Sequence, residues 1–212
     1  MTKKTIFIAV ELIVILNITA FSQNFRFRLL AGVDLANVKT MNMPDAYEEY
    51  DEYLRYYPMI AYNLNGDIEY RKSAKWGLAI QPGFIQKGGR DKRSDGYVRY
   101  NLNYIQLPVL FNYYFADKFY LSIGPELSYM MSAKVRSKDN SVDITDWYDR
   151  RTELSGLAGI NYKITDKLAV GLRYNHGLTY IYKNTWMNGL GEIVYEPKHY
   201  NQYMQLIVKI EI

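Results

Sequence analysis

The sequence predicts an all-β protein: an eight-stranded antiparallel up-and-down transmembrane β-barrel with four long extracellular loops and three short periplasmic turns. Eight segments alternate apolar and polar residues with a period of two, the repeat of a β-strand. The links between them alternate short and long, as in outer-membrane barrels. Aromatic residues make up 16% of the chain, and its 22 tyrosines favour strands and the boundary between lipid and water. Beyond residue 22, no apolar stretch is long enough for a spanning helix, which excludes a helical membrane protein.

The first 22 residues have the pattern of a secretory signal peptide. A basic pair at positions 3 and 4 precedes an apolar run from Ile6 to Ile18, and the small residues Ala20 and Ser22 stand at positions −3 and −1 of the expected cleavage point. The run is shorter than the roughly 20 apolar residues of a membrane-anchoring helix. We therefore predict a signal peptide over residues 1–22 and one barrel domain over residues 23–212.

Charge and cysteine content restrict the partners and the covalent chemistry. The formal net charge of +4 is too near neutral to indicate a nucleic-acid partner. There is no cysteine, so disulfides and a lipid-modified N-terminal cysteine are excluded. Packing and backbone hydrogen bonds must hold the mature chain together, and we predict no cofactor.

The first three strands are predicted at residues 25–38, 59–70 and 76–87. In the first, apolar residues such as Phe27 and Leu29 alternate with Arg26 and Arg28, which places the two sets on opposite faces of a sheet. In the third, Pro82 cannot donate a ladder hydrogen bond, so a bulge or local break is expected there.

The other five strands are predicted at residues 97–115, 119–131, 152–164, 168–181 and 200–212. In the first of these the apolar phase moves by one residue between Tyr104 and Ile105, which predicts a β-bulge in that strand. The short turns are expected at residues 71–75, 116–118 and 165–167, and the long loops at 39–57, 88–96, 132–150 and 182–199.

Alternation alone does not show whether the apolar faces meet lipid or a dry interior. A soluble lipocalin-like barrel that binds apolar ligands has the same period with its faces reversed. Three features favour lipid: apolar rows of the length that a tilted crossing strand needs, aromatic residues at the ends of the rows, and ionisable groups on the opposite face, whose burial in an apolar pocket is costly. We therefore expect the barrel to contact outer-membrane lipid in a Gram-negative bacterium.

The inward rows predict a plugged lumen, because side chains fill a barrel of eight strands. The first strand must neighbour both the second and the eighth in a closed barrel, so six charges near the periplasmic end are expected to interleave as ion pairs. Glu126 and Arg173 are expected to meet across Gly159. A structural plug is favoured over a path for protons or small ions. The predicted lumen network comprises Arg26, Arg28, Asp67, Glu69, Glu126, Arg173, Lys209 and Glu211.

No motif indicates catalysis or metal binding. A lipid-modifying enzyme on such a barrel needs a histidine base near a serine nucleophile, and the chain has two histidines, His176 and His199. His176 shares its parity with outward residues, and no serine stands beside it in the sequence; His199 lies at the edge of a loop. Both are interpreted as interfacial polar residues, and no metal-ligand spacing is present.

The first long loop combines acids with tyrosines, a composition suited to binding cations, glycans or a protein partner. A solvated loop without a partner is the alternative. The candidate interaction residues are Tyr47, Glu48, Glu49, Tyr50, Asp51, Glu52 and Tyr53.

Three segments carry a family resemblance: residues 104–115 (YIQLPVLFNYYF), 122–128 (SIGPELS) and 171–178 (GLRYNHGL). With them the chain resembles the PorT-like outer-membrane β-barrel family of the Bacteroidota over nearly all of its mature length. The resemblance implies an eight-stranded outer-membrane barrel, and PorT itself is linked to type IX secretion. The first hypothesis is a non-enzymatic structural or loop-mediated interaction protein. A lipid-modifying enzyme and a soluble lipocalin-like binder are the alternatives.

Overall fold

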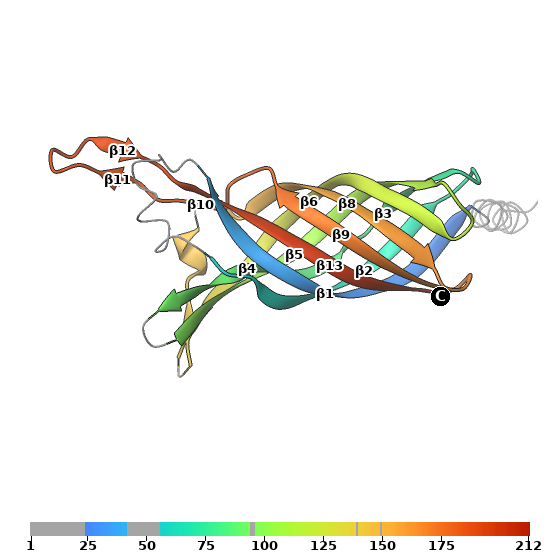
Figure 1. Ribbon diagram of the computed structural model, residues 1–212, viewed down its shortest axis with the longest axis horizontal. Coiled ribbons are helices and arrows are strands. Elements are labelled where there is room, and N and C mark those ends of the chain that lie inside the picture. The colour runs from blue at the N-terminus through green and yellow to red at the C-terminus, as the bar shows by residue number, and fades with distance from the viewer. Residues whose placement is uncertain (1–23, 42–55, 94–95, 139, 149) are drawn as a thin grey trace, which may run out of the picture.

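The computed structural model describes residues 24–41, 56–93, 96–138, 140–148 and 150–212. These residues form a closed antiparallel barrel (Figure 1). Strand β1 (Phe25–Met41) pairs with β2 (Met59–Tyr70) on one side and with β13 (Lys198–Glu211) on the other, which closes the ring. Between β2 and β13 the ring runs through β3 (Trp76–Ile80) with β4 (Gly83–Arg93), β5 (Gly96–Tyr114), β6 (Phe119–Arg136), β8 (Thr152–Lys163) and β9 (Leu168–Gly177). The predicted fold class is confirmed.

Strands β3 and β4 together form one of the eight positions in the ring, with a break at Pro82. β2 pairs with β3 and with β4, and β5 does the same on the other side. At the break, the backbone N–H of Gln81 donates to the backbone carbonyl of Pro108 at 2.9 Å, and the backbone N–H of Gly66 donates to that of Pro82 at 2.9 Å. The expected local break is confirmed, and neighbouring strands satisfy the backbone groups around it.

The outer surface of the ring is apolar. Leu78 is 49% exposed, Leu121 45% and Leu206 63%, while Val170 is half-buried. The predicted outward rows are therefore correct, and the lipocalin-like alternative is wrong because that barrel encloses its apolar faces. Within the described residues, no helix is both long and apolar enough to cross a membrane.

The bulge predicted between Tyr104 and Ile105 in β5 is wrong. Leu102 and Tyr104 point inward and are buried, whereas Ile105 points outward, so the alternation of β5 continues through this point. The irregularity lies in the partner strand: Asn103 pairs with Ser132 and Tyr104 with Met130, which leaves Met131 of β6 as the additional residue.

What changes at Tyr104 is the chemistry on the two faces of the wall. On the extracellular side of Tyr104, most buried interior side chains are apolar, Lys87 excepted. The outer face there carries a polar ladder, in which Gln86 Nε2 donates to Asn103 Oδ1 at 3.1 Å and Asn103 Nδ2 donates to Ser132 Oγ at 3.0 Å. On the periplasmic side, the outward residues Ile105 and Leu107 are apolar, and the interior holds buried charged and polar side chains beside a small apolar cluster around Leu110. The sequence pattern shifted because the surroundings of the strand change from lipid to water.

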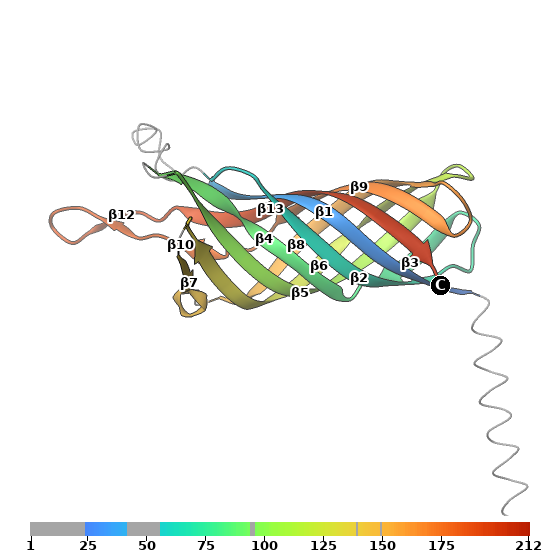
Figure 2. The same ribbon diagram turned by 90° about the horizontal axis from the view of Figure 1, so that it is seen from below.

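At the end opposite the short turns, strands and hairpins extend beyond the closed ring of the barrel (Figure 2). The loops predicted at residues 88–96, 132–150 and 182–199 are largely structured, since β4, β5 and β6 continue into them. They also contain β7 (Ser141–Asp143), the 3₁₀ helix η2 (Thr145–Trp147), β10 (Tyr182–Lys183), β11 (Trp186–Met187) and β12 (Ile193–Tyr195). β9 ends at Gly177, four residues before its predicted end. The hairpin of β11 and β12 projects far from the barrel in both views. The predicted signal peptide lies outside the described residues.

Candidate functional site

The periplasmic half of the lumen holds a buried ion-pair cluster, called here the lower network: Arg28, Asp67, Glu69 and Lys209. Arg28 Nε donates to Asp67 Oδ2 at 3.0 Å, and its Nη2 donates to Glu69 Oε2. Lys209 Nζ lies 3.1 Å from Asp67 Oδ2. The register explains the cluster, because Arg28 of β1 pairs with Asp67 of β2 and with Glu211 of β13. Arg26 lies 3.9 Å from Glu211 at the rim, so the structure brings together all six charges expected to interleave here.

Neutral side chains satisfy the remaining acceptors of the lower network. Asn112 Nδ2 donates to Glu69 Oε1 at 2.8 Å, and the Tyr114 hydroxyl donates to the same oxygen. Gln81 Nε2 donates to Asp67 Oδ1 at 3.1 Å, and Arg173 Nη1 donates to Gln81 Oε1 at 2.8 Å. Buried charges are tolerated when they are both paired and hydrogen-bonded. Arg28, Asp67 and Glu69 meet both conditions, whereas Lys209 is paired with Asp67 without a hydrogen bond of good geometry.

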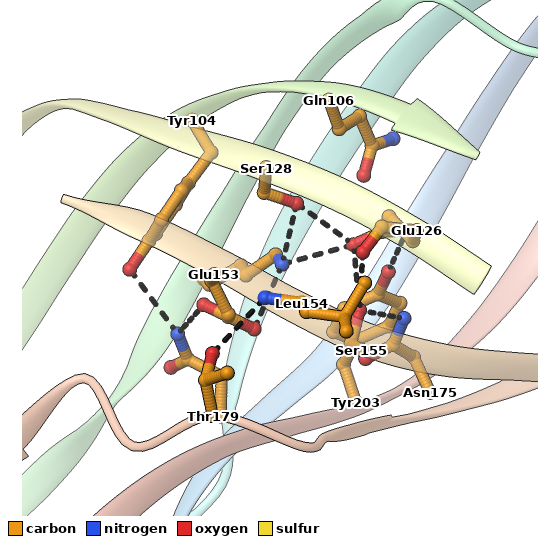
Figure 3. Close-up of polar contacts among 12 residues, drawn as sticks. Tyr104, Gln106, Glu126, Ser128, Glu153, Leu154, Ser155, Asn175, Thr179 and Tyr203 are labelled. Carbon is orange, nitrogen blue, oxygen red and sulfur yellow. Dashed lines mark hydrogen bonds and ion pairs between the residues drawn. The ribbon is translucent and has the colours of Figure 1, made fainter.

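A second cluster, called here the upper network, is centred on Lys87 of β4. Figure 3 shows its acceptors Glu126, Ser128 and Glu153. The Lys87 ammonium donates to Glu126 Oε1 at 2.9 Å, to Ser128 Oγ at 3.1 Å and to Glu153 Oε1 at 3.1 Å. These three acceptors match the three protons of an ammonium. The ammonium and both carboxylates are buried, and they come from β4, β6 and β8. The upper network therefore joins strands on different sides of the lumen.

Tyrosine and asparagine side chains complete the upper network. The Tyr203 hydroxyl donates to Glu126 Oε2 at 2.6 Å, and Asn201 Nδ2 donates to Glu153 Oε2 at 2.7 Å. Ser155 Oγ lies 3.3 Å from Glu126 Oε1 (Figure 3). Every carboxylate oxygen that Lys87 leaves open is thus occupied by a neutral donor.

The contact expected between Glu126 and Arg173 does not form. Glu126 pairs with Lys87, and Arg173 donates to Gln81. Arg173 is therefore linked through Gln81 to the lower network. Gly159 does make room for Arg173, since a Cβ there would lie 2.6 Å from Arg173 Cγ. Lys87 and Glu153 were missed as site residues. The signal was present, because both have inward parity on their strands, but parity does not show which side chains meet across the lumen.

The interior beyond the upper network is filled by apolar side chains, called here the upper apolar cluster. Its buried members are Ala36, Val38, Met59, Ala61, Ile85, Leu102, Tyr104, Met130, Ala133, Ile144, Ile181 and Tyr203. Tyr56 and Tyr148 pack against this cluster from the extracellular segments, and burial raises the pKa of both phenols. The cluster therefore seals the extracellular end of the barrel.

Among the described residues, the hydrogen-bond partners of the two histidines are threonine, tyrosine and asparagine side chains. His199 is buried with its Nδ1 3.1 Å from Thr40 Oγ1, and Tyr182 stacks on its ring at 5.7 Å. His176 is half-buried, with its Nδ1 3.4 Å from the Tyr174 hydroxyl. Among the described residues, no group of three metal-ligating side chains comes together. Among the described residues, no serine side chain is hydrogen-bonded to either histidine.

The extracellular surface of the described chain carries exposed apolar side chains on the β11–β12 hairpin. Leu190 at its tip is 85% exposed, and Met187 and Ile193 are also exposed. Trp186 stacks on Tyr195 at 5.5 Å, and Lys183 pairs with Glu196 at 2.8 Å near the base. The hydrogen bond from Lys183 Nζ lowers the pKa of the Glu196 carboxyl. The candidate interaction residues 47–53 of the first loop lie outside the described residues.

Comparisons with known proteins agree with this architecture. Residues 21–183 match a family model described as an outer membrane protein beta-barrel domain. The structure of Neisserial surface protein A (NspA) is 13% identical, with 88% of this chain and 97% of that chain covered and a TM-score of 0.53. Ail, the attachment invasion locus protein of Yersinia pestis, is 11% identical, with 88% and 98% covered and a TM-score of 0.47. OprG from Pseudomonas aeruginosa is 12% identical, with 88% and 95% covered and a TM-score of 0.44. No curated protein sequence matches the chain.

Proposed function

Since the chain belongs to the outer membrane protein β-barrel domain family and lies in the outer membrane of a Gram-negative bacterium, we propose that it is a non-enzymatic, non-conducting barrel that acts through its extracellular segments. Its role is that of a structural or interaction protein. The observation that carries this proposal is a contrast: the lumen is occupied by paired charges and apolar side chains, while the β11–β12 hairpin offers apolar side chains to the outside.

The buried charges of the lumen support the absence of conduction. Among the described residues, the buried arginine, lysine, aspartate and glutamate side chains are four cations (Arg28, Lys87, Arg173 and Lys209) and five acids (Asp34, Asp67, Glu69, Glu126 and Glu153). The cations contact carboxylates or amides directly, which leaves them unable to serve a passing ion without breaking the plug. The proposed partner is therefore met outside the barrel.

The hairpin supports a protein or glycan partner. Tryptophan, tyrosine and methionine are enriched where proteins meet. The β11–β12 hairpin projects away from the barrel (Figure 1), and Trp186, Met187 and Leu190 on it are exposed. The tyrosine-rich first loop is a second proposed contact region, on sequence grounds.

Two finer proposals rest on different grounds. The resemblance to the PorT-like barrels of the Bacteroidota supports a link to secretion, and the residue pattern of the first 22 positions supports cleavage of a signal peptide after Ser22. N-terminal sequencing of protein purified from outer membranes tests the second. A mature chain that begins at Gln23 is the expected result, and an intact N-terminus contradicts it.

Absence of enzymatic activity is supported by the surroundings of His176 and His199, neither of which has a serine partner among the described contacts. Mass spectrometry of lipid A and phospholipids from cells with and without the gene tests this. Unchanged profiles are expected, and a changed acyl pattern would favour a lipid-modifying enzyme.

The main test combines conductance with a shortened hairpin. In planar bilayers the protein is expected to give no steady channel current, and stable channels contradict a plugged lumen. Replacing residues 184–197 by Asn-Gly connects Lys183 directly to Lys198, which already pair, through a two-residue turn. The matched variant Met187→Ser/Leu190→Ser/Ile193→Ser keeps the length of the hairpin and removes its apolar surface.

Cross-linking on intact cells, followed by purification, then compares the three proteins. Both variants are expected to lose the same extracellular partner while keeping the heat-modifiable gel migration of a folded barrel. An identical set of cross-linked partners in all three proteins contradicts the role of the hairpin.

A further inference from the structure

A basic cavity opens at the periplasmic mouth of the barrel, outside both lumen networks. Its volume is about 700 Å³, and it lies between the turn after β2 and the turn after β5. Asp117 is the one acid in its lining, against five cations. These cations, which define the periplasmic pocket, are Arg26, Arg71, Lys72, Lys75 and Lys163.

The charges of the periplasmic pocket are not neutralised as those of the lumen are. Arg26 lies at the limit of ion-pair distance from Glu211, at 3.9 Å. In the part of the chain that the structure describes, Arg71, Lys72, Lys75 and Lys163 form no ion pair with a carboxylate. The other two short turns each carry one acid and one lysine, so the excess of positive charge is confined to this side of the mouth.

The floor of the pocket contacts two of its five cations, Arg71 and Lys163. The Arg71 guanidinium carbon lies 3.6 Å from the centroid of the Tyr114 ring, and Lys163 Nζ lies 4.8 Å from it. Arg71 also donates to the carbonyls of Ser73 and Ala74, at 3.3 and 2.7 Å. Tyr114 in turn donates its hydroxyl proton to Glu69 of the lower network. A guanidinium held this way loses little conformational freedom when it binds an anion.

The height of the pocket matches the headgroups of the inner leaflet. Trp76 directly follows Lys75, and the exposed rings of Phe115 and Phe119 stack at 6.1 Å beside the turn after β5. Aromatic side chains of this kind mark the boundary between the hydrocarbon and the aqueous phase. Cations at this depth meet phosphate groups of lipids first.

We propose that the periplasmic pocket binds a phosphate-bearing anion. Two sources carry this chemistry at the periplasmic face: the headgroup of an anionic phospholipid in the inner leaflet, and free phosphate. Arginine and lysine donors are the groups that recognise phosphate oxygens, and Ser73 adds a hydroxyl to the lining. The site is independent of the proposed extracellular function, since it lies at the opposite end of the barrel.

The test uses a double variant and a control with the same change in charge. Lys72→Gln/Lys75→Gln removes two exposed lysines of the pocket, and Lys118→Gln/Lys167→Gln removes two exposed lysines from the other periplasmic turns. Native mass spectrometry in detergent measures retention of phosphatidylglycerol and of phosphatidylcholine by each full-length protein. Equilibrium dialysis against inorganic phosphate forms the second arm. Heat-modifiable migration shows that each barrel is folded.

Preferential retention of phosphatidylglycerol is expected for the unchanged protein and for the control. The pocket variant is expected to lose about five-fold in retention per lysine, the usual effect of a lysine near an anionic surface. If the pocket variant loses binding of inorganic phosphate but retains phosphatidylglycerol as the control does, the site is assigned to free phosphate. Equal binding by the pocket variant and the control, with both ligands, overturns the proposal.

Discussion

The lower network and the upper apolar cluster occupy the same lumen, yet one is built from charges and the other from hydrocarbon. The difference follows the surroundings of the barrel wall. Where outward residues such as Leu107 and Leu121 face lipid, the interior holds the lower network beside a small apolar cluster. Where the outer face carries the ladder of Gln86, Asn103 and Ser132, most buried interior side chains are apolar, with Lys87 as the charged exception. Above the membrane the wall therefore follows the rule of a soluble sheet, with apolar residues inside. Below that level the rule is inverted.

Replacing Lys87 with methionine is expected to have the largest effect on this comparison. It leaves Glu126 and Glu153 buried without their shared cation, and removing one partner of a buried pair costs about 3–5 kcal/mol. The free energy of unfolding in lipid vesicles, measured in urea, should fall by that amount. The triple variant Lys87→Met/Glu126→Gln/Glu153→Gln should recover most of the loss, because no charge is then left unpaired. A Lys87→Met protein as stable as the parent would contradict the account, because it would show that the two carboxyls do not depend on the ammonium.

Truncating Leu102 to alanine probes the upper apolar cluster. The cavity left by a fully buried leucine costs about 2–5 kcal/mol of unfolding free energy. Truncating the outward Ile105 to alanine is the matched control, and it should cost less because acyl chains fill the space of the removed atoms and no cavity is left. Equal losses would mean that the two faces of β5 are not chemically different at this height.

Arginine substitutions on the outer face of β5 test at which height the outward residues pass from lipid to water. Leu107→Arg puts a charge among acyl chains and is expected to cost about 2–4 kcal/mol in refolding equilibria in vesicles. Asn103→Arg, four residues nearer the extracellular end on the same face, should cost roughly 0–1 kcal/mol because it meets water or headgroups. Similar losses at the two positions would place both in the same surroundings.

The partly exposed Arg26–Glu211 contact at the rim can be compared with the buried ion pairs of Arg28 for its contribution to the free energy of unfolding. Both Arg26 and Glu211 are partly exposed and 3.9 Å apart, so Arg26→Gln is expected to change the unfolding free energy by less than about 1 kcal/mol. Arg28→Gln removes the partner of Asp67 and Glu69 and should cost several times more. Urea unfolding of the two variants side by side measures the ratio, and equal losses would contradict a buried lower network.

The smallest effect concerns the extracellular hairpin and pH. Hydrogen bonds from Lys183 and Thr185 lower the pKa of the Glu196 carboxyl below its usual value. A lowered pKa in the folded state means that this contact stabilises the hairpin at neutral pH and that the stabilisation is lost as the pH falls through the lowered pKa. A pH titration of Glu196 by NMR should give a lower pKa than in the Lys183→Met variant. An equal pKa of Glu196 in both proteins would show that the contact with Lys183 does not stabilise its charged form.

The sequence allowed the strands and the charges of neighbouring strands to be predicted, because both depend on period and adjacency. The strand predicted at residues 59–70 is β2, and Arg28 meets Asp67 because β1 and β2 are neighbours. Contacts across the lumen could not be predicted, since they depend on the tilt and stagger of the closed ring. Lys87 therefore reaches Glu126 and Glu153, where a pair of Glu126 with Arg173 was expected. The extracellular strands were predicted as loops because strands in water carry polar residues on their outer face.

Lipid-borne quenching along β5 is the most direct measurement of where the inversion occurs. The chain has no cysteine, so single cysteines at positions 103, 105, 107 and 109 can each carry one fluorophore. A quencher on the acyl chains should reach the probes at positions 105, 107 and 109 and leave the probe at 103 fluorescent. Quenching of all four probes alike, or of none, would contradict a barrel wall whose polarity reverses at the membrane surface.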